Sequence, residues 1–91
     1  MKYIALGKDK YVSSEDVIAV FDLDITSQSY LTRKFLSASE KSGIVENAAE
    51  DIPKSFIVCY EKEKHSVYLS QMATATLAKR FDAEKNSKEV I

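Results

Sequence analysis

Apolar residues fill a run at 56–60, and this run predicts the strand, over residues 55–60, around which the other elements pack. A second strand is predicted at 66–69, after a charged turn at 61–65. Because the first strand lacks polar alternation, we expect it to be covered on both faces or to face another subunit. Ser70 predicts the N-cap of a terminal helix over residues 71–81.

The N-terminal part of the chain also consists of short apolar runs separated by polar residues. They predict three strands, at residues 2–6, 11–13 and 17–21. The first two form a hairpin whose turn, 7–10, uses the backbone freedom of Gly7. Residues 14–16 predict a corner, with a short helical turn over 14–17 capped by Ser14 as the alternative, and residues 22–24 end the third strand.

A helical period begins after possible N-caps at 26–29 and ends before Gly43, a residue typical of the position after a helix, with Lys41 in the last turn. The apolar stripe comprises Tyr30, Leu31, Phe35 and Ala38, with Leu36 and Ser42 fitting less well. We expect this stripe to pack on the sheet as core rather than to line a cofactor groove. The acidic segment that follows, 44–51, has no clear period and predicts a brief strand at 44–45.

In the terminal helix, four residues are expected to face inward: Met72, Ala73, Leu77 and Phe81. Residues 82–91 are polar and predict a flexible tail. The fold class is therefore α+β: one small β-rich domain over 1–81, with about five short strands, an amphipathic central helix and a C-terminal helix.

The composition indicates a small domain that gains stability by self-association. The chain has 91 residues, of which 45% are hydrophobic, and domains of this size often oligomerise. The single cysteine, Cys59, cannot form an internal disulfide, which fits a reducing cytosol, and its strand position predicts a buried, inert thiol. Without a signal-like N-terminus or an apolar run near the roughly 20 residues of a membrane span, we expect a cytoplasmic protein with no membrane partner.

Residues able to carry catalysis or to bind a metal are sparse. The one histidine, His65, is expected in an exposed turn, and two glycines cannot supply a phosphate-binding loop. The paired carboxylates, which are Glu15/Asp16, Asp22/Asp24 and Glu50/Asp51, are interpreted as solvated loop residues rather than as an acid–base pair or cation site. We therefore expect no enzyme, no cofactor, no metal and no small-molecule substrate.

The charge distribution is uneven although the net charge is only −1. Residues 1–26 carry three cations and five anions, whereas residues 27–43 carry three cations and one anion. If the two predicted helices lie side by side, their cations form one basic surface for phosphates: Arg33, Lys34, Lys79 and Arg80. The alternative is that these are ordinary solvated helix faces, with the cations near the end of the second helix matching its dipole.

Several short motifs, in order, resemble one known family. They are Tyr3–Gly7, Val12–Ser13, Val17–Asp22, Pro53–Val58, Val67–Ser70 and Leu77–Arg80. Their order and spacing over residues 1–81 resemble the Rem family, small regulators of extracellular-matrix genes in Gram-positive bacteria. Phe21-Asp22 and the Pro53-Lys54-Ser55 start of the next strand look closer to the B-type than to the A-type members.

This resemblance implies a fold akin to LytTR-type DNA-binding domains, a ring-shaped homo-oligomer and a role in transcription of biofilm-matrix genes. In A-type members, arginines around the ring contact DNA from two loops. Here the first of these loops has Asp16 about where an arginine would stand, and the second has Glu50 and Asp51, with Lys54 as its basic residue. Carboxylates repel phosphates, so those contacts do not carry over.

Two functions follow. In the first, the protein is a DNA-binding regulator whose phosphate contacts have moved to other cations: Lys8, Lys10, Arg33, Lys34, Lys54, Lys79 and Arg80. In the second, it is an oligomeric interaction module that does not bind DNA and acts on a protein partner, as its acidic loops favour.

Overall fold

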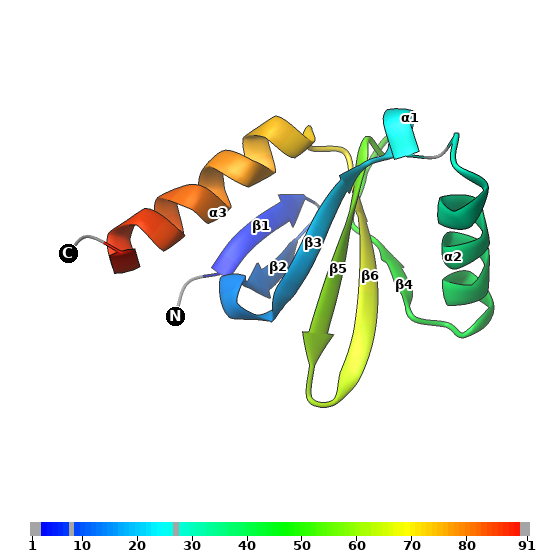
Figure 1. Cartoon of the computed structure of the whole chain (residues 1–91), viewed down its shortest axis with the longest axis horizontal. Helices are drawn as coiled ribbons and strands as arrows, with labels where there is room; N and C mark the ends of the chain where they lie inside the picture. The colour runs from blue at the N-terminus through cyan, green and yellow to red at the C-terminus, as the bar shows by residue number, and fades with distance from the viewer. Residues whose placement is uncertain (1–2, 8, 27, 90–91) are drawn as a thin grey trace.

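The structure is a computed structural model that describes residues 3–7, 9–26 and 28–89, with the side chains of 26 and 82–89 excepted. The described strands form a two-stranded sheet, β1–β2, and a four-stranded sheet of order β3-β5-β6-β4 (Figure 1). The elements are β1 (Tyr3–Gly7), β2 (Lys10–Ser13), the 3₁₀ helix η1 (Ser14–Asp16), β3 (Val17–Asp22), α1 (Leu23–Thr26), α2 (Tyr30–Lys41), β4 (Val45–Asn47), β5 (Ser55–Glu61), β6 (Lys64–Ser70) and α3 (Thr74–Glu89). The predicted α+β class is confirmed.

The N-terminal hairpin is present, with β1 and β2 antiparallel. Ile4, Leu6 and Val12 are buried on its inner side. Gly7 has a φ of +134°, and a Cβ there would lie 2.6 Å from the Ala48 carbonyl oxygen, so the backbone requires glycine. Residues 2 and 8, which the sequence assigns to the first strand and its turn, lie outside the described residues.

The β5–β6 hairpin is tighter than predicted. Its strands extend to Glu61 and from Lys64, so the turn consists of Lys62 and Glu63 rather than residues 61–65. Both turn residues have positive φ, 50° and 65°. Two positive φ values in a two-residue hairpin loop are typical of a type I′ turn, whose twist matches that of the flanking strands. Neither residue here is the glycine or asparagine that such turns favour.

The four-stranded sheet presents its two faces to different surroundings. On the inner face, Ile57 and Cys59 join Leu6, Val12 and Leu77 in the core. The buried position predicted for Cys59 is confirmed. Because alternate residues of a strand point to opposite faces, the neighbours of Ile57 and Cys59 on β5 belong to the outer face.

A β-bulge in β3 increases the apolar area of that outer face. The register with β5 shifts between Val17 and Ala19, which leaves Ile18 as the extra residue. Ile18 and Ala19 consequently both line the outer side, together with Phe56 and Val58 of β5. The unbroken apolar run of this strand is therefore used on both faces.

Helix α2 has the predicted ends but turns a different side to the sheet. Ser29 Oγ accepts a hydrogen bond from Thr32 N at 3.5 Å, and Gly43 has a φ of +73° after the helix. The expected core stripe is wrong: Tyr30, Leu31, Phe35, Ala38 and Ser42 are exposed. The inward stripe is Thr32, Leu36 and Ser39, of which only Ser39 is fully buried. It is offset by one residue from the predicted stripe, which is about 100° around a helix.

Ser70 does not cap the terminal helix. It is the last residue of β6, and its hydroxyl donates to the Leu6 carbonyl oxygen at 2.5 Å and accepts from Met72 N at 3.1 Å. The hydroxyl thus links β6 to β1 of the N-terminal hairpin. Helix α3 begins later, at Thr74. Leu77 is fully buried, as predicted, while Ala73 is exposed.

Other boundaries also differ from expectation. Residues 14–16 form the helical turn given as the alternative, but its cap is Ser13, whose Oγ accepts from Glu15 N at 3.3 Å. The brief strand after α2 is confirmed one residue later, as β4, which runs parallel to β6. The backbone of α3 stays helical to Glu89, past the expected end at 81, and residues 90–91 lie outside the described part.

Candidate functional site

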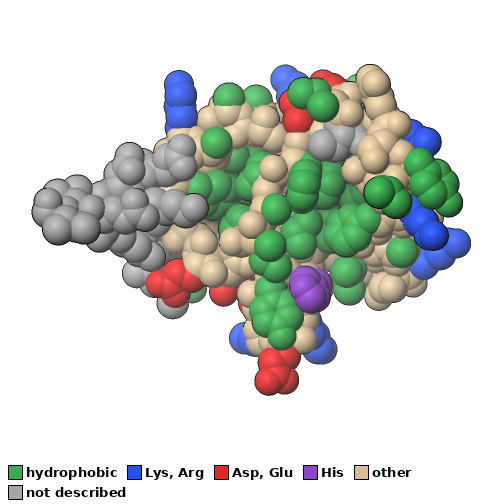
Figure 2. All heavy atoms as spheres, viewed as in Figure 1, with side chains coloured by type: hydrophobic (Ala, Val, Ile, Leu, Met, Phe, Trp, Pro, Cys, Tyr) green, Lys and Arg blue, Asp and Glu red, His purple; other side chains and the backbone are tan. Residues whose placement is uncertain are grey.

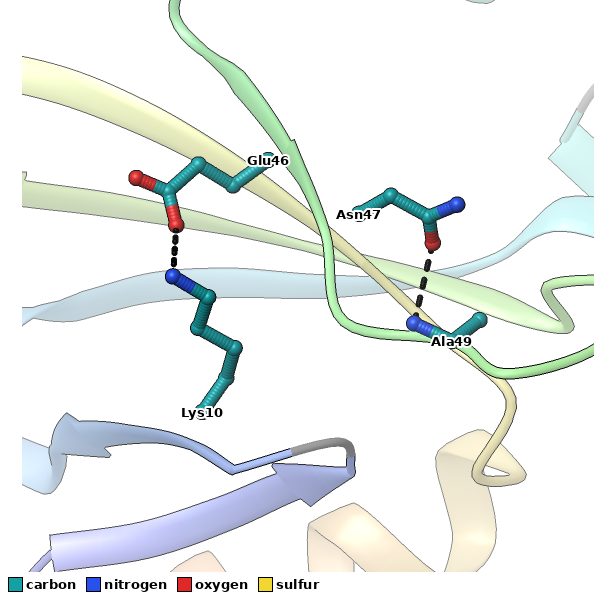
Figure 3. A network of polar contacts seen from close by, with 4 residues as sticks. All are labelled: Lys10, Glu46, Asn47 and Ala49. Atoms are coloured by element: carbon teal, nitrogen blue, oxygen red, sulfur yellow. Dashed lines mark hydrogen bonds and ion pairs between the residues drawn. The ribbon is translucent and has the colours of Figure 1, made fainter.

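The cations suggested as phosphate contacts differ in their surroundings, and Lys10 is already paired. Its Nζ lies 2.8 Å from Glu46 Oε2 on β4, and both side chains are about half exposed (Figure 3). Beside this pair, Asn47 Oδ1 accepts from Ala49 N at 2.9 Å and fixes the turn after β4. Glu46 offsets the Lys10 charge, so this lysine contributes little net attraction for phosphate. Lys8 lies outside the described residues.

Three exposed cations belong to chain segments that adjoin α1. Arg33 and Lys34 are in the first turns of α2, where the Arg33 guanidinium donates to the Gln28 carbonyl oxygen at 2.9 Å. The Lys54 carbonyl oxygen accepts from Leu23 N, in α1, at 2.9 Å. Lys54 and the start of α2 both adjoin α1, so we group these three exposed cations and call them the α2 basic region.

The remaining two cations lie at the other end of the molecule. Lys79 and Arg80 are exposed on α3, and Arg80 Nη1 donates to the Ala5 carbonyl oxygen at 3.3 Å. Figure 1 shows α3 and α2 at opposite ends, with the strands between them. The hypothesis of one basic surface across two adjacent helices is therefore wrong, because the two helices pack on different parts of the sheets.

Acidic side chains occupy the loops where the family resemblance would place arginines. Asp16 is half-buried in η1, and Glu50 and Asp51 are exposed before β5. The second loop is held in place because Gln71 Oε1 accepts from the backbone N–H groups of Glu50 and Asp51, at 2.7 and 3.2 Å. Its carboxylates remain at the surface, where they oppose the approach of a polyanion.

An apolar hollow opens on the outer side of the sheet, between β3, β5 and α2. Its volume is about 350 Å³, and it is lined by Ile18, Ala19, Phe21, Leu31, Thr32, Phe35, Phe56 and Val58. Phe21 stacks on Phe56 with ring centroids 4.8 Å apart, and the Phe35 ring lies 6.3 Å from Phe56. Hydrophobic side chains gather across the centre of Figure 2, which has the same view as Figure 1. We call the hollow lined by the eight residues above the groove.

The groove was not predicted from the sequence, although the apolar run of one strand indicated an additional covered face. The run in β5 lacks polar alternation, which predicted a strand covered on both faces or facing another subunit. What the pattern did not reveal is that α2 leaves much of the outer face open. Leu31 and Phe35 were consequently assigned to the core, whereas they are exposed at the edge of the groove.

Comparison with family models relates the chain to known proteins. The model of RemA-like proteins, described as extracellular matrix regulatory protein A-like, matches residues 3–81. The chain belongs to this RemA-like family. The match confirms the family resemblance, and it covers both sheets, α2 and the first part of α3. The B-type assignment stays a prediction. A search of curated proteins found no match.

Membership in the RemA-like family places the protein among regulators of the extracellular matrix. Its cysteine and its histidine both pack against neighbouring side chains. Burial raises the pKa of the Cys59 thiol to about 12, with further contributions from Glu61 and Asp16, so the thiol is protonated at neutral pH. His65 packs against Tyr60, with ring centroids 4.7 Å apart.

Two features are absent from the part of this RemA-like chain that the structure describes. No cluster of three or more His, Cys, Asp or Glu side chains there is placed to hold a metal ion. No helix there combines the length and the apolar character needed to cross a membrane.

Proposed function

We propose that this protein regulates the expression of extracellular-matrix genes in the cytoplasm by binding DNA as a ring-shaped homo-oligomer. The observation that carries the proposal is the family match over residues 3–81, since the family consists of extracellular matrix regulatory proteins. The assembly is supported by the open apolar groove, because exposed apolar patches of this kind mark interaction surfaces.

The α2 basic region is the part of the surface best suited to DNA. Arg33 and Lys34 are on α2, Lys54 lies next to α1, and all three are exposed. Each phosphate contact is weak alone, but a ring presents the same three cations once per subunit. Simultaneous contacts on one duplex then raise the overall affinity by avidity.

Fluorescence anisotropy of a labelled promoter-length duplex, titrated at several salt concentrations, tests this function. Three phosphate contacts predict a slope of log K against log salt of about −2.7 for each subunit engaged. Arg33→Glu/Lys34→Glu should abolish binding at physiological salt. Lys79→Glu, on α3 at the other end of the molecule, is the matched control and should bind nearly as wild type. Equal binding by the double variant and wild type would exclude α2 as the contact surface.

A second function, an oligomeric interaction module that acts on a protein partner without binding DNA, is favoured by the acidic loops. Asp16, Glu50 and Asp51 stand at the positions discussed above, and Lys10 is offset by Glu46. The same titration decides between the two. Absence of binding at low salt, by protein with a folded circular dichroism spectrum, would support the interaction module and refute DNA binding.

A further inference from the structure

The groove is an exposed surface whose side chains are unusually apolar for contact with water. Leu31 is 74% exposed and Ile18 is 57% exposed, and both border the hollow. Aromatic rings form its base, with Phe56 buried beneath Phe21. Among the side chains that line it, Thr32 supplies the polar group. A partner with an apolar, partly aromatic surface and a hydroxyl to pair with would match this lining.

A second apolar surface lies on the N-terminal hairpin. Tyr3 and Tyr11 are 65% and 62% exposed. Ala5 pairs directly with Tyr11 across the two strands, and Tyr3 is two residues from Ala5, so the three share one side of the hairpin. We call this surface, Tyr3–Ala5–Tyr11, the ridge. Tyrosines combine a rigid apolar ring with a polar tip and are frequent anchors of interfaces.

The groove and the ridge face away from each other. The inner side of the hairpin, with Leu6 and Val12, packs on the inner face of the four-stranded sheet at Ile57. The ridge is on the opposite side of that hairpin, and the groove is on the outer face of that sheet. The two surfaces of one chain therefore lie on opposite sides of the stacked sheets and cannot meet within a single subunit.

We propose that the groove of one copy binds the ridge of a second copy of this chain. This inference rests on the homo-oligomer of the proposed function and identifies its contact surfaces. A contact between two different surfaces is heterologous, so an open chain of copies keeps a free groove at one end and a free ridge at the other until it closes into a ring. A groove-to-groove contact would instead be two-fold and would stop at a dimer. The Thr32 hydroxyl is the group in the groove that a ridge tyrosine hydroxyl would pair with.

Two exposed positions allow each surface to be disabled separately. Leu31→Glu places a charge in the groove and Tyr11→Glu places one on the ridge. Each should weaken self-association by roughly 100-fold or more, as expected for an anchor at the centre of an interface. Ile52→Glu is the matched control, because Ile52 is 79% exposed and belongs to neither surface. Leu31→Ser and Tyr11→Ser give a milder second pair, and circular dichroism verifies folding.

Mixing the two variants provides the decisive measurement. The Tyr11→Glu copy keeps its groove and the Leu31→Glu copy keeps its ridge, so an equimolar mixture should form heterodimers that cannot grow further. Sedimentation velocity at concentrations up to hundreds of micromolar measures this. Monomers in the mixture, or a Tyr11→Glu protein that assembles as wild type does, would overturn the inference while leaving the proposed homo-oligomer in place. A monomeric wild type would overturn both.

Discussion

Removing the side chain of Leu77 should measure how strongly α3 holds the fold together. Leu77 is 0% exposed and lies in the core between the hairpin and the sheet, with Phe81 of the same helix packed against that core. Leucine-to-alanine changes at fully buried sites cost about 2–5 kcal/mol, so Leu77→Ala should lower the free energy of unfolding by about 3 kcal/mol. At about 4–8 °C per kcal/mol for domains of 60–100 residues, this corresponds to a melting temperature lower by about 12–24 °C.

Urea denaturation followed by circular dichroism measures this loss. Wild type and variant must be compared at equal concentration, because self-association adds to apparent stability. The control is Thr76→Ala, an exposed position on the same helix, which should change stability by less than about 0.5 kcal/mol. If Leu77→Ala falls within that same range, α3 does not dock on the core through this residue and the packing described above is refuted.

Two further predictions concern buried groups. Ser70→Ala removes the hydroxyl that joins Leu6 to the end of β6. Because its buried partners are then unpaired, the free energy of unfolding in the same urea assay should fall by about 1–3 kcal/mol. A decrease of less than about 0.5 kcal/mol would show that this hydrogen bond contributes little to stability. The pKa of Cys59 is raised from 9.0 to about 12 in the folded chain. The unfolded chain therefore loses the thiol proton first as pH rises, and stability should fall between about pH 9 and pH 12. Cys59→Ala should lessen this fall in pH-dependent denaturation, and an identical slope would contradict the assignment.

The sequence predicted best the features that depend on neighbouring residues. The ends of α2 follow from Ser29 and Gly43, because a capping hydroxyl and a left-handed backbone position act within a few residues. The strands β5 and β6 follow from their β-branched and aromatic composition. Family membership also followed from the order of short motifs, since the match covers almost the same residues.

Features set by distant contacts were not predictable in the same way. Ser70 has the chemistry of a helix cap, but its hydroxyl bonds to Leu6, 64 residues away. The extra residue in β3 changes which side chains share the outer face, and no local pattern marks it. The wrong stripe on α2 has the same origin. The pattern assigned the more apolar residues, such as Leu31 and Phe35, to the inner side, but packing on the sheet turns the less apolar stripe of Thr32, Leu36 and Ser39 inward.

The candidate site was predictable as a set of residues but not as an arrangement. The individual cations are evident in the sequence, yet their distribution between the two ends of the molecule depends on where each helix packs. Lys10 illustrates the limit most clearly. Its partner, Glu46, is on a strand of the other sheet, so the ion pair exists only because the hairpin packs beside β4.

The small area of contact between α2 and the sheet has a consequence for hydrogen exchange. Its 12 residues are too few for a helix that is stable alone in water. It rests on the sheet through Thr32, Leu36 and Ser39, with hollows on both sides of that line. The helix should therefore unfold locally more often than β5 does, so the α2 amides should exchange with solvent faster than those of β5. A second copy bound in the groove would pack against α2 and stabilise it. Protection of the α2 amides against hydrogen exchange should therefore rise with protein concentration.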